Sequence, residues 1–459
     1  GNAAIRGAAY FGKRANKKPS KLHSVFVSGY VLTLTDAVLE HVKSNVGASY
    51  AFHDEGAYRN ELGHGDMRRA PEALRMVNSG LPEGEEPLGE IEIGRYYGNP
   101  ADRSLRVMHN ERILHPFQPY IVEATANQIE FFEKVFDHES SISSRDQIWY
   151  WKEILSLVAM VAALASLVPF AGMMLGTAYF SRLVHPQPPV LPTPRGRGRI
   201  LFWGLLALSA LIACFSYIPL SELSQRVFVD ASSRKATWFF PQRMNNAVLL
   251  WAVFNGALGF SIFFGSYRLH GKKHGVRPEM WGAQTSLSEL GRTLLLALMT
   301  FVFFYTVLFV VYYFLHVDYR FLFMGVRPFQ PPLVPLLAMY APLFFVFFLS
   351  NSLRVNGGIR FSPRANWRSL LLGGVANSLG LLFIVIVQYV TFARTGTVFW
   401  TDGWLYVNLL FGVVPMMFLL PYFNRYFFQM TGRIYLGAMV TCLVFIMILL
   451  SNTVCYIPL

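Results

Sequence analysis

His115 and Asp54 are the two side chains whose types and positions most favour chemistry. His115 follows an apolar run in "ERILHPFQPY", and Asp54 follows another in "AFHDEGAY". An imidazole can take the proton of a hydroxyl, and a carboxylate can hold that imidazole in the required tautomer. We therefore expect His115 as a general base oriented by Asp54. Glu55 and Asp66 compete with Asp54 for the second role, and Asp36 is a weaker rival.

The elements around these residues alternate between helix and strand. "SVFVSGYVL" is rich in β-branched and aromatic residues, as a buried strand would be. In chain order we expect helix 2–12, strand 24–32, helix 35–45, strand 47–56, helix 66–80, strand 104–110 and helix 121–136. This alternation predicts right-handed βαβ units and a parallel sheet with flanking helices. Sites in such sheets lie at the carboxyl ends of strands, where Asp54 and His115 both fall.

The same order carries a resemblance to a family. A strand followed by an acid, a helix, a strand followed by a histidine, and a last helix resemble the C-terminal part of an α/β hydrolase, in which the chain order is Ser, then Asp or Glu, then His. "GNAAIRGAAYF" resembles the small-residue helix that follows the nucleophilic serine of that fold. The resemblance covers about residues 1–137 and implies that the serine lies upstream of Gly1. No metal or organic cofactor is implied.

The chain changes character near residue 146. Residues 1–150 hold 17 Lys and Arg against 20 Asp and Glu, whereas residues 151–459 hold 23 against 7. We expect a soluble domain over 1–145 and a transmembrane helical domain over 146–459. The basic excess belongs to membrane loops, and no nucleic-acid surface is indicated, because no basic stripe interleaves with aromatics in the soluble part. The three cysteines, Cys214, Cys442 and Cys455, form no metal-ligand or disulfide pattern.

Eight apolar segments are long enough to cross a bilayer, which takes about 20 residues. They span about 154–180, 200–220, 245–266, 293–316, 331–353, 369–392, 404–422 and 434–453. The odd-numbered connections between them hold 15 Lys and Arg, and the even-numbered ones hold 7. The positive-inside rule then predicts that the odd connections are cytoplasmic and the soluble domain extracytoplasmic. Ionisable residues are nearly absent from the predicted spans, so no ion path stands out.

These observations favour a multi-pass protein of the cell membrane, similar to bacterial membrane-anchored serine hydrolases. The expected reaction is hydrolysis of an ester, thioester or amide of a small-molecule or lipid-like acyl substrate, with the lipid bilayer as the other partner. Two alternatives stay open. One is a permease or lipid exporter with a non-catalytic, hydrolase-like sensing domain, and the other is an acyltransferase that uses the same triad. The sequence does not decide the oligomeric state or whether the membrane domain only anchors.

Overall fold

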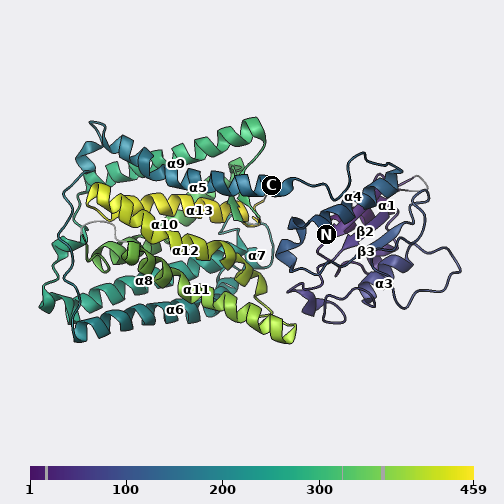
Figure 1. Cartoon of the computed structure of the whole chain (residues 1–459), viewed down its shortest axis with the longest axis horizontal. Helices are drawn as coiled ribbons and strands as arrows, with labels where there is room; N and C mark the ends of the chain where they lie inside the picture. Colours follow the sequence, from purple (N-terminus) through teal and green to yellow (C-terminus); the bar gives the residue numbers. More distant parts are fainter. Residues whose placement is uncertain (16–18, 323, 363–366, 459) are drawn as a thin grey trace. The chain divides into compact units, whose positions relative to one another are not determined.

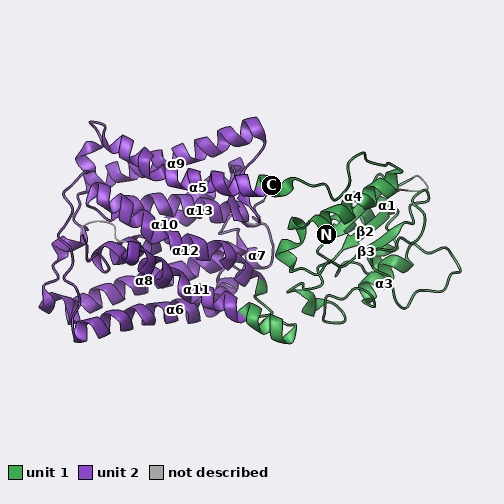
Figure 2. Cartoon of the chain, in the orientation of Figure 1, with its two compact units in different colours: residues 1–152, 388–404 green, residues 153–387, 405–459 purple. Residues whose placement is uncertain are grey.

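The chain divides into two compact units (Figure 2). The computed structural model describes residues 1–15, 19–322, 324–362 and 367–458. Unit 1 comprises residues 1–152 together with 388–404, and unit 2 comprises 153–387 and 405–459. The second part of unit 1 is a short stretch taken from the end of one long apolar helix and the beginning of the next.

Unit 1 alternates helices and strands along the chain (Figure 1). Its elements are α1 (Asn2–Lys13), β1 (Ser24–Ser28), α2 (Asp36–Leu39), β2 (Asn45–Ser49), α3 (Pro71–Asn78), β3 (Arg106–His109), the 3₁₀ helix η2 (His115–Tyr120) and α4 (Val122–Phe136). The three strands pair in the order β1-β2-β3, and both pairings are parallel. The predicted small parallel sheet is thereby confirmed. All three carboxyl ends lie at one edge of it.

The side chains of the strands divide between two cores with the period of two that a pleated sheet requires. One face carries Val25, Val27, Val46, Ala48 and Met108, which pack with residues of α1, α2 and α3. The other face packs Phe26 and Val107 with Phe131 of α4. The sheet is therefore a middle layer between helices.

Gly47, in the middle of β2, is required by this packing. A Cβ atom at Gly47 would lie 2.5 Å from the ring of Phe26 and 2.9 Å from that of Phe131. Because such rings cannot retreat inside a packed layer, α4 approaches the sheet only where the central strand lacks a side chain. The absence of a side chain at Gly47 therefore sets how closely α4, the helix after the histidine loop, packs on the sheet.

Several expected elements are shorter than the sequence suggests. The helix expected over 35–45 is the single turn α2, and the strands end at residues 28, 49 and 109 rather than 32, 56 and 110. The third expected helix starts at Pro71, since proline suits the first helical turn and residues 66–70 form a polar turn instead. Apolar residues continue beyond β1 and β2 because the loops that leave these two strands are largely buried, as at Val31, Tyr50 and Ala51.

Unit 2 consists largely of long apolar helices (Figure 1). The eight expected spans are confirmed as helices long and apolar enough to cross a membrane. They are α5 (Trp149–Leu175), α6 (Arg197–Val227), α8 (Arg243–Leu269), α9 (Leu287–Leu315), α10 (Val334–Gly357), α11 (Trp367–Thr395), α12 (Trp404–Thr431) and α13 (Tyr435–Asn452). Between them lie the short helix α7 (Val229–Ser232), the hairpin of β4 (Tyr319–Phe321) and β5 (Met324–Val326), and short 3₁₀ helices.

The interior of the bundle is more polar than the sequence analysis expects. Helix α12 continues to Thr431 instead of ending near residue 422, so Arg425 lies inside it, buried, with its guanidinium donating to the Val355 carbonyl at 2.7 Å. Asn351 bridges two helices, donating to Asn377 at 2.7 Å and accepting from Asn424 at 3.0 Å. Interhelical amide bonds of this kind hold apolar helices together where lipid offers no hydrophobic drive.

Candidate functional site at the carboxyl edge of the sheet

The loops that leave β2 and β3 run side by side beyond the sheet. The amides of Tyr50, Phe52 and His53 donate to the carbonyls of His109, Glu111 and Ile113 at 2.7–3.1 Å. His53 and Leu114 form a parallel bridge at the end of this ladder. The residue after each of them is Asp54 on one loop and His115 on the other. The pairing of the two loops therefore sets these two side chains opposite each other.

Asp54 and His115 meet directly. Their side chains are joined by a hydrogen bond of 2.7 Å, in which the Nδ1–H of His115 donates to Oδ2 of Asp54. The other oxygen, Oδ1, accepts the Gly56 amide at 2.6 Å. Asp54 is buried, and about a third of the His115 side chain is exposed. This is the acid and imidazole pairing that leaves Nε2 available at a surface.

Glu55 lies beside the pair but contacts the loop backbone rather than the imidazole ring. Its Oε2 accepts the backbone amide of His115 at 3.1 Å, and its Oε1 accepts the hydroxyl of Tyr389 at 2.6 Å. Glu55 is only 2% exposed. The competitor of Asp54 named from the sequence is thus a residue that positions the histidine loop.

Residues 388–404 form a wall of the site within unit 1. The ring of Trp404 meets the imidazole of His115 edge-on, with centroids 5.7 Å apart. The guanidinium of Arg59 lies 5.3 Å from the centre of the same indole. The hydroxyl of Tyr58 donates to the Thr401 carbonyl at 2.6 Å. A segment that connects two apolar helices therefore completes the surroundings of the histidine.

The electrostatics of the site favour a protonated imidazole. Burial lowers the pKa of His115, but the hydrogen bond and the charge of Asp54, with a contribution from Glu55, outweigh burial and raise that pKa above its ordinary value. Burial raises the pKa of Glu55, and the charge of Asp54 acts in the same direction. A base with a raised pKa holds an accepted proton well, which suits an imidazolium that forms during a reaction.

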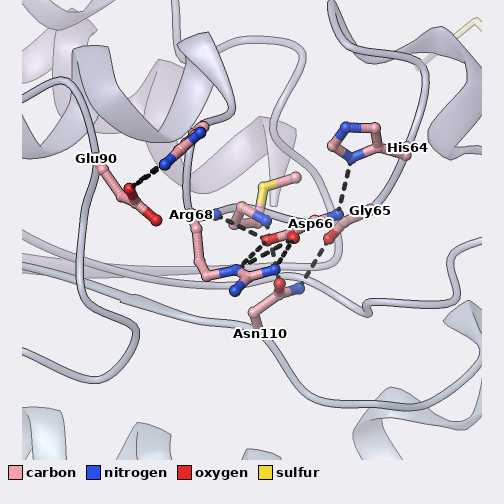
Figure 3. Close-up of polar contacts among 8 residues, drawn as sticks. His64, Gly65, Asp66, Arg68, Glu90 and Asn110 are labelled. Atoms are coloured by element: carbon pink, nitrogen blue, oxygen red, sulfur yellow. Dashed lines mark hydrogen bonds and ion pairs between the residues drawn. The ribbon is translucent and has the colours of Figure 1, made fainter.

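Asp66, the other nearby competitor, is engaged elsewhere (Figure 3). Its carboxylate accepts two nitrogens of Arg68, at 3.0 Å for Nε to Oδ1 and 2.5 Å for Nη2 to Oδ2. Its backbone amide donates to His64, and the Asn110 side chain donates to the Gly65 carbonyl. This cluster fastens the turn before α3. Asp36 is exposed in the first turn of α2.

A buried polar network centred on Glu111 holds the histidine loop in place. Glu111 accepts Ser49 Oγ at 2.8 Å and Gln118 Nε2 at 3.1 Å on Oε2, and Asn127 Nδ2 at 2.8 Å on Oε1. Gln118 also donates to Ser49 at 2.6 Å. The network ties the end of β2 to η2 and α4, so it fixes both ends of the segment that carries His115. Each bond to a buried carboxylate contributes more than a neutral bond would.

The start of α1 lies at the same edge as this pair. A Cβ atom at Gly1 would lie 2.7 Å from Cβ of Tyr30 and 2.8 Å from the Ser28 carbonyl oxygen. Gly29 follows β1 with φ of +67°, and a Cβ atom there would lie 3.2 Å from Cε1 of His115. Gly29 therefore lets the backbone after β1 approach the imidazole closely.

Asp54 and His115 are predicted from the sequence, and the structure brings these two together. Tyr389, Trp404 and the Glu111 network are not predicted from the sequence. The stretch "VFWTDGWLY" contains two tryptophans at a helix start, which by composition indicates only a membrane interface. Nothing in the sequence joins it to a loop more than 280 residues earlier in the chain.

Comparisons with known proteins give no relative: no family model matches the chain, and no curated protein or solved structure is significantly similar to it.

Proposed function

We propose that the protein is a membrane-embedded serine hydrolase of the α/β-hydrolase type, and that this chain supplies its acid and its base. The observation that carries the proposal is the 2.7 Å bond between Asp54 Oδ2 and His115 Nδ1 at the carboxyl edge of a parallel sheet. The acid follows the middle strand and the histidine follows the last strand, which is the chain order of that fold.

In this mechanism Nε2 of His115 takes the proton of a serine hydroxyl as the serine oxygen attacks an acyl carbonyl. The imidazolium then protonates the leaving group, and water repeats the sequence to release the acid. Asp54 holds Nδ1–H throughout and stabilises the imidazolium. Glu55 positions the loop through the His115 amide.

The nucleophile in this proposal precedes α1. Gly1 lies against residues 28–30, and Gly29 lies against His115, so a residue just N-terminal to Gly1 would emerge at the edge that holds the histidine. The first amides of α1 would point toward the oxyanion that forms on the attacked carbonyl. This arrangement favours a strand–serine–helix turn immediately upstream of Gly1.

The wall of residues 388–404 favours a lipid-like acyl substrate. Trp404 touches His115 and begins α12, one of the eight apolar helices. A substrate that reaches Nε2 would therefore lie against the beginning of a membrane span, where tryptophan prefers the boundary between water and hydrocarbon. Amphiphilic esters gather at that boundary.

The proposal is tested on the protein with its natural residues upstream of Gly1, in membranes, by labelling with a fluorophosphonate probe. We expect labelling of one serine in a G-x-S-x-G turn next to α1, and its loss in His115→Gln. His53→Gln is the matched control, because His53 is an exposed neighbour of Asp54 and should leave labelling intact.

Two results would overturn the hydrolase. A Gly or Ala in place of the upstream serine, with no labelling, would favour the sensing domain of a permease or exporter. Acyl transfer to an added alcohol in preference to water would assign the same site to an acyltransferase.

A further inference from the structure

Unit 2 contains a cavity of about 450 Å³ that the proposed hydrolase does not use. Helices α6, α8, α10 and α11 line it, together with residues 191–195 and the turn 270–276. These two segments belong to the first and third connections of the bundle. The cavity thus opens at the end of the bundle that carries the odd-numbered, arginine-rich and lysine-rich connections.

Two buried donors in this cavity have no acceptor. Nε of Arg354 and Nε1 of Trp281 are both shielded from solvent, and neither has a hydrogen-bond partner in the part of the chain that the structure describes. Gly259 makes the room for Arg354, since a Cβ atom there would lie 3.2 Å from its Nε and 2.4 Å from Ser350 Oγ. A buried donor without an acceptor destabilises the folded protein, so a ligand that supplies an acceptor is favoured. Both atoms are donors only, so the ligand that satisfies them must present acceptors.

Arg195 and Arg354 give the cavity positive charge, without acids to neutralise it. Arg195 and His274 are exposed lining residues, and His270 stacks on His274 with ring centroids 3.7 Å apart. No Asp or Glu occurs among the described residues that line the cavity. A cationic pocket without carboxylates favours an anion, and arginine in particular favours phosphate oxygens.

The remaining wall is apolar. Leu201, Phe202, Leu205, Leu206, Ile262 and Phe263 line it on α6 and α8. The amides of Asn351 and Asn377 at the cavity are bonded to each other. A free inorganic anion would leave this apolar surface in water, whereas an acyl chain would cover it.

We propose that the cavity binds the phosphate headgroup of an anionic phospholipid, with the glycerol and the first acyl carbons against α6 and α8. Arg354 and Trp281 donate to the phosphate oxygens, and Arg195 closes the entrance. This site is separate from the Asp54–His115 pair and does not depend on the hydrolase proposal.

The test uses the purified chain in nanodiscs of phosphatidylcholine, titrated with phosphatidylglycerol, with lipid retention followed by native mass spectrometry and stability by thermal unfolding. We expect phosphatidylglycerol to be retained and to raise the unfolding temperature. Arg354→Gln should weaken the apparent affinity about tenfold, as for the loss of a charge-assisted bond. Arg243→Gln is the control, because Arg243 is at the other end of α8 and donates to Tyr406 Oη at 2.9 Å.

A second variant tests the cavity independently, in case Arg354→Gln fails to fold. Ser209→Phe fills the cavity while keeping every charge, and it should also abolish retention. Equal retention of phosphatidylglycerol by wild type and both cavity variants would overturn the site. Inorganic phosphate that stabilises the protein in phosphatidylcholine discs as strongly as phosphatidylglycerol does would overturn the lipid assignment in favour of a soluble phosphate ligand.

Discussion

Asp54 and Glu55 are adjacent carboxylates in one buried loop, and their surroundings give them different tasks. Asp54 bonds the imidazole at 2.7 Å, and Glu55 bonds the backbone amide of the same histidine at 3.1 Å. The charge of Asp54 favours protonation of both neighbours, so it raises the pKa of His115 and adds to the raised pKa of Glu55. Which of the two is the acid partner cannot be read from "HDEG", because the choice depends on how the two loops pair beyond the sheet.

Asp54→Asn should lower the pKa of His115. The substitution keeps the shape of the side chain but removes the charge that outweighs burial, so desolvation dominates. The measurement is the titration of the His115 signal in ¹³Cε1-histidine spectra of the chain in detergent, with the signal assigned by its absence in His115→Gln. An unchanged or higher pKa would contradict the role given to Asp54. On the hydrolase proposal, the same change should slow fluorophosphonate labelling by about 10⁴, the loss known for the equivalent change in a Ser-His-Asp triad.

At the scale of elements, the segment 388–404 lowers the pKa of His115, whereas Asp54 raises it. Trp404 shields the imidazole of His115, and burial is the influence that lowers its pKa. A connection between two apolar helices therefore tunes a base on a distant loop.

Trp404→Ala should raise the pKa of His115, because water replaces the indole and solvates the imidazolium. The same histidine titration measures it, and the sign is opposite to that expected for Asp54→Asn. Phe399→Ala is the matched control, since Phe399 is an aromatic residue of the same segment and is 61% exposed. A shift in Phe399→Ala as large as that in Trp404→Ala would show that the segment acts through its overall packing rather than through the indole contact.

The order of the elements follows from local patterns, but their lengths do not. The period of two in β1 and the long apolar runs of α5, α6 and α8–α13 are local signals, and they indicate the sheet and the spans correctly. Strand ends depend on tertiary contacts: β2 stops at Ser49, whose side chain donates to Glu111, a residue 62 positions later in the chain. The partners Tyr389 and Trp404 depend on chain folding over hundreds of residues, which no local pattern encodes.

At the scale of the whole molecule, the distribution of positive charge predicts the direction of insertion. The odd connections carry most Lys and Arg, and the cavity that we assign to an anionic phospholipid opens among them. The charge bias and the cavity therefore suggest the same side of the bilayer, the cytoplasmic one.

Lys235→Cys and Lys273→Cys test this orientation, because both lysines are exposed and only α8 separates them. In a Cys455→Ser background, a membrane-impermeant maleimide should label Lys235→Cys in intact cells and Lys273→Cys only after permeabilisation. The other native cysteines, Cys214 and Cys442, are buried and should stay unlabelled. The reverse pattern would invert the orientation.

The bond between Glu55 and Tyr389 joins residues 334 positions apart. A ribosome would therefore complete the acid, the histidine and their supporting network long before it reaches the wall that closes around them. Until α11 and α12 are made, Glu55 lacks its tyrosine and the imidazole lacks its indole. On the hydrolase proposal, the nascent protein would acquire its mature reactivity only once α11 and the start of α12 have been made, a delay that spares other esters on the route to the membrane.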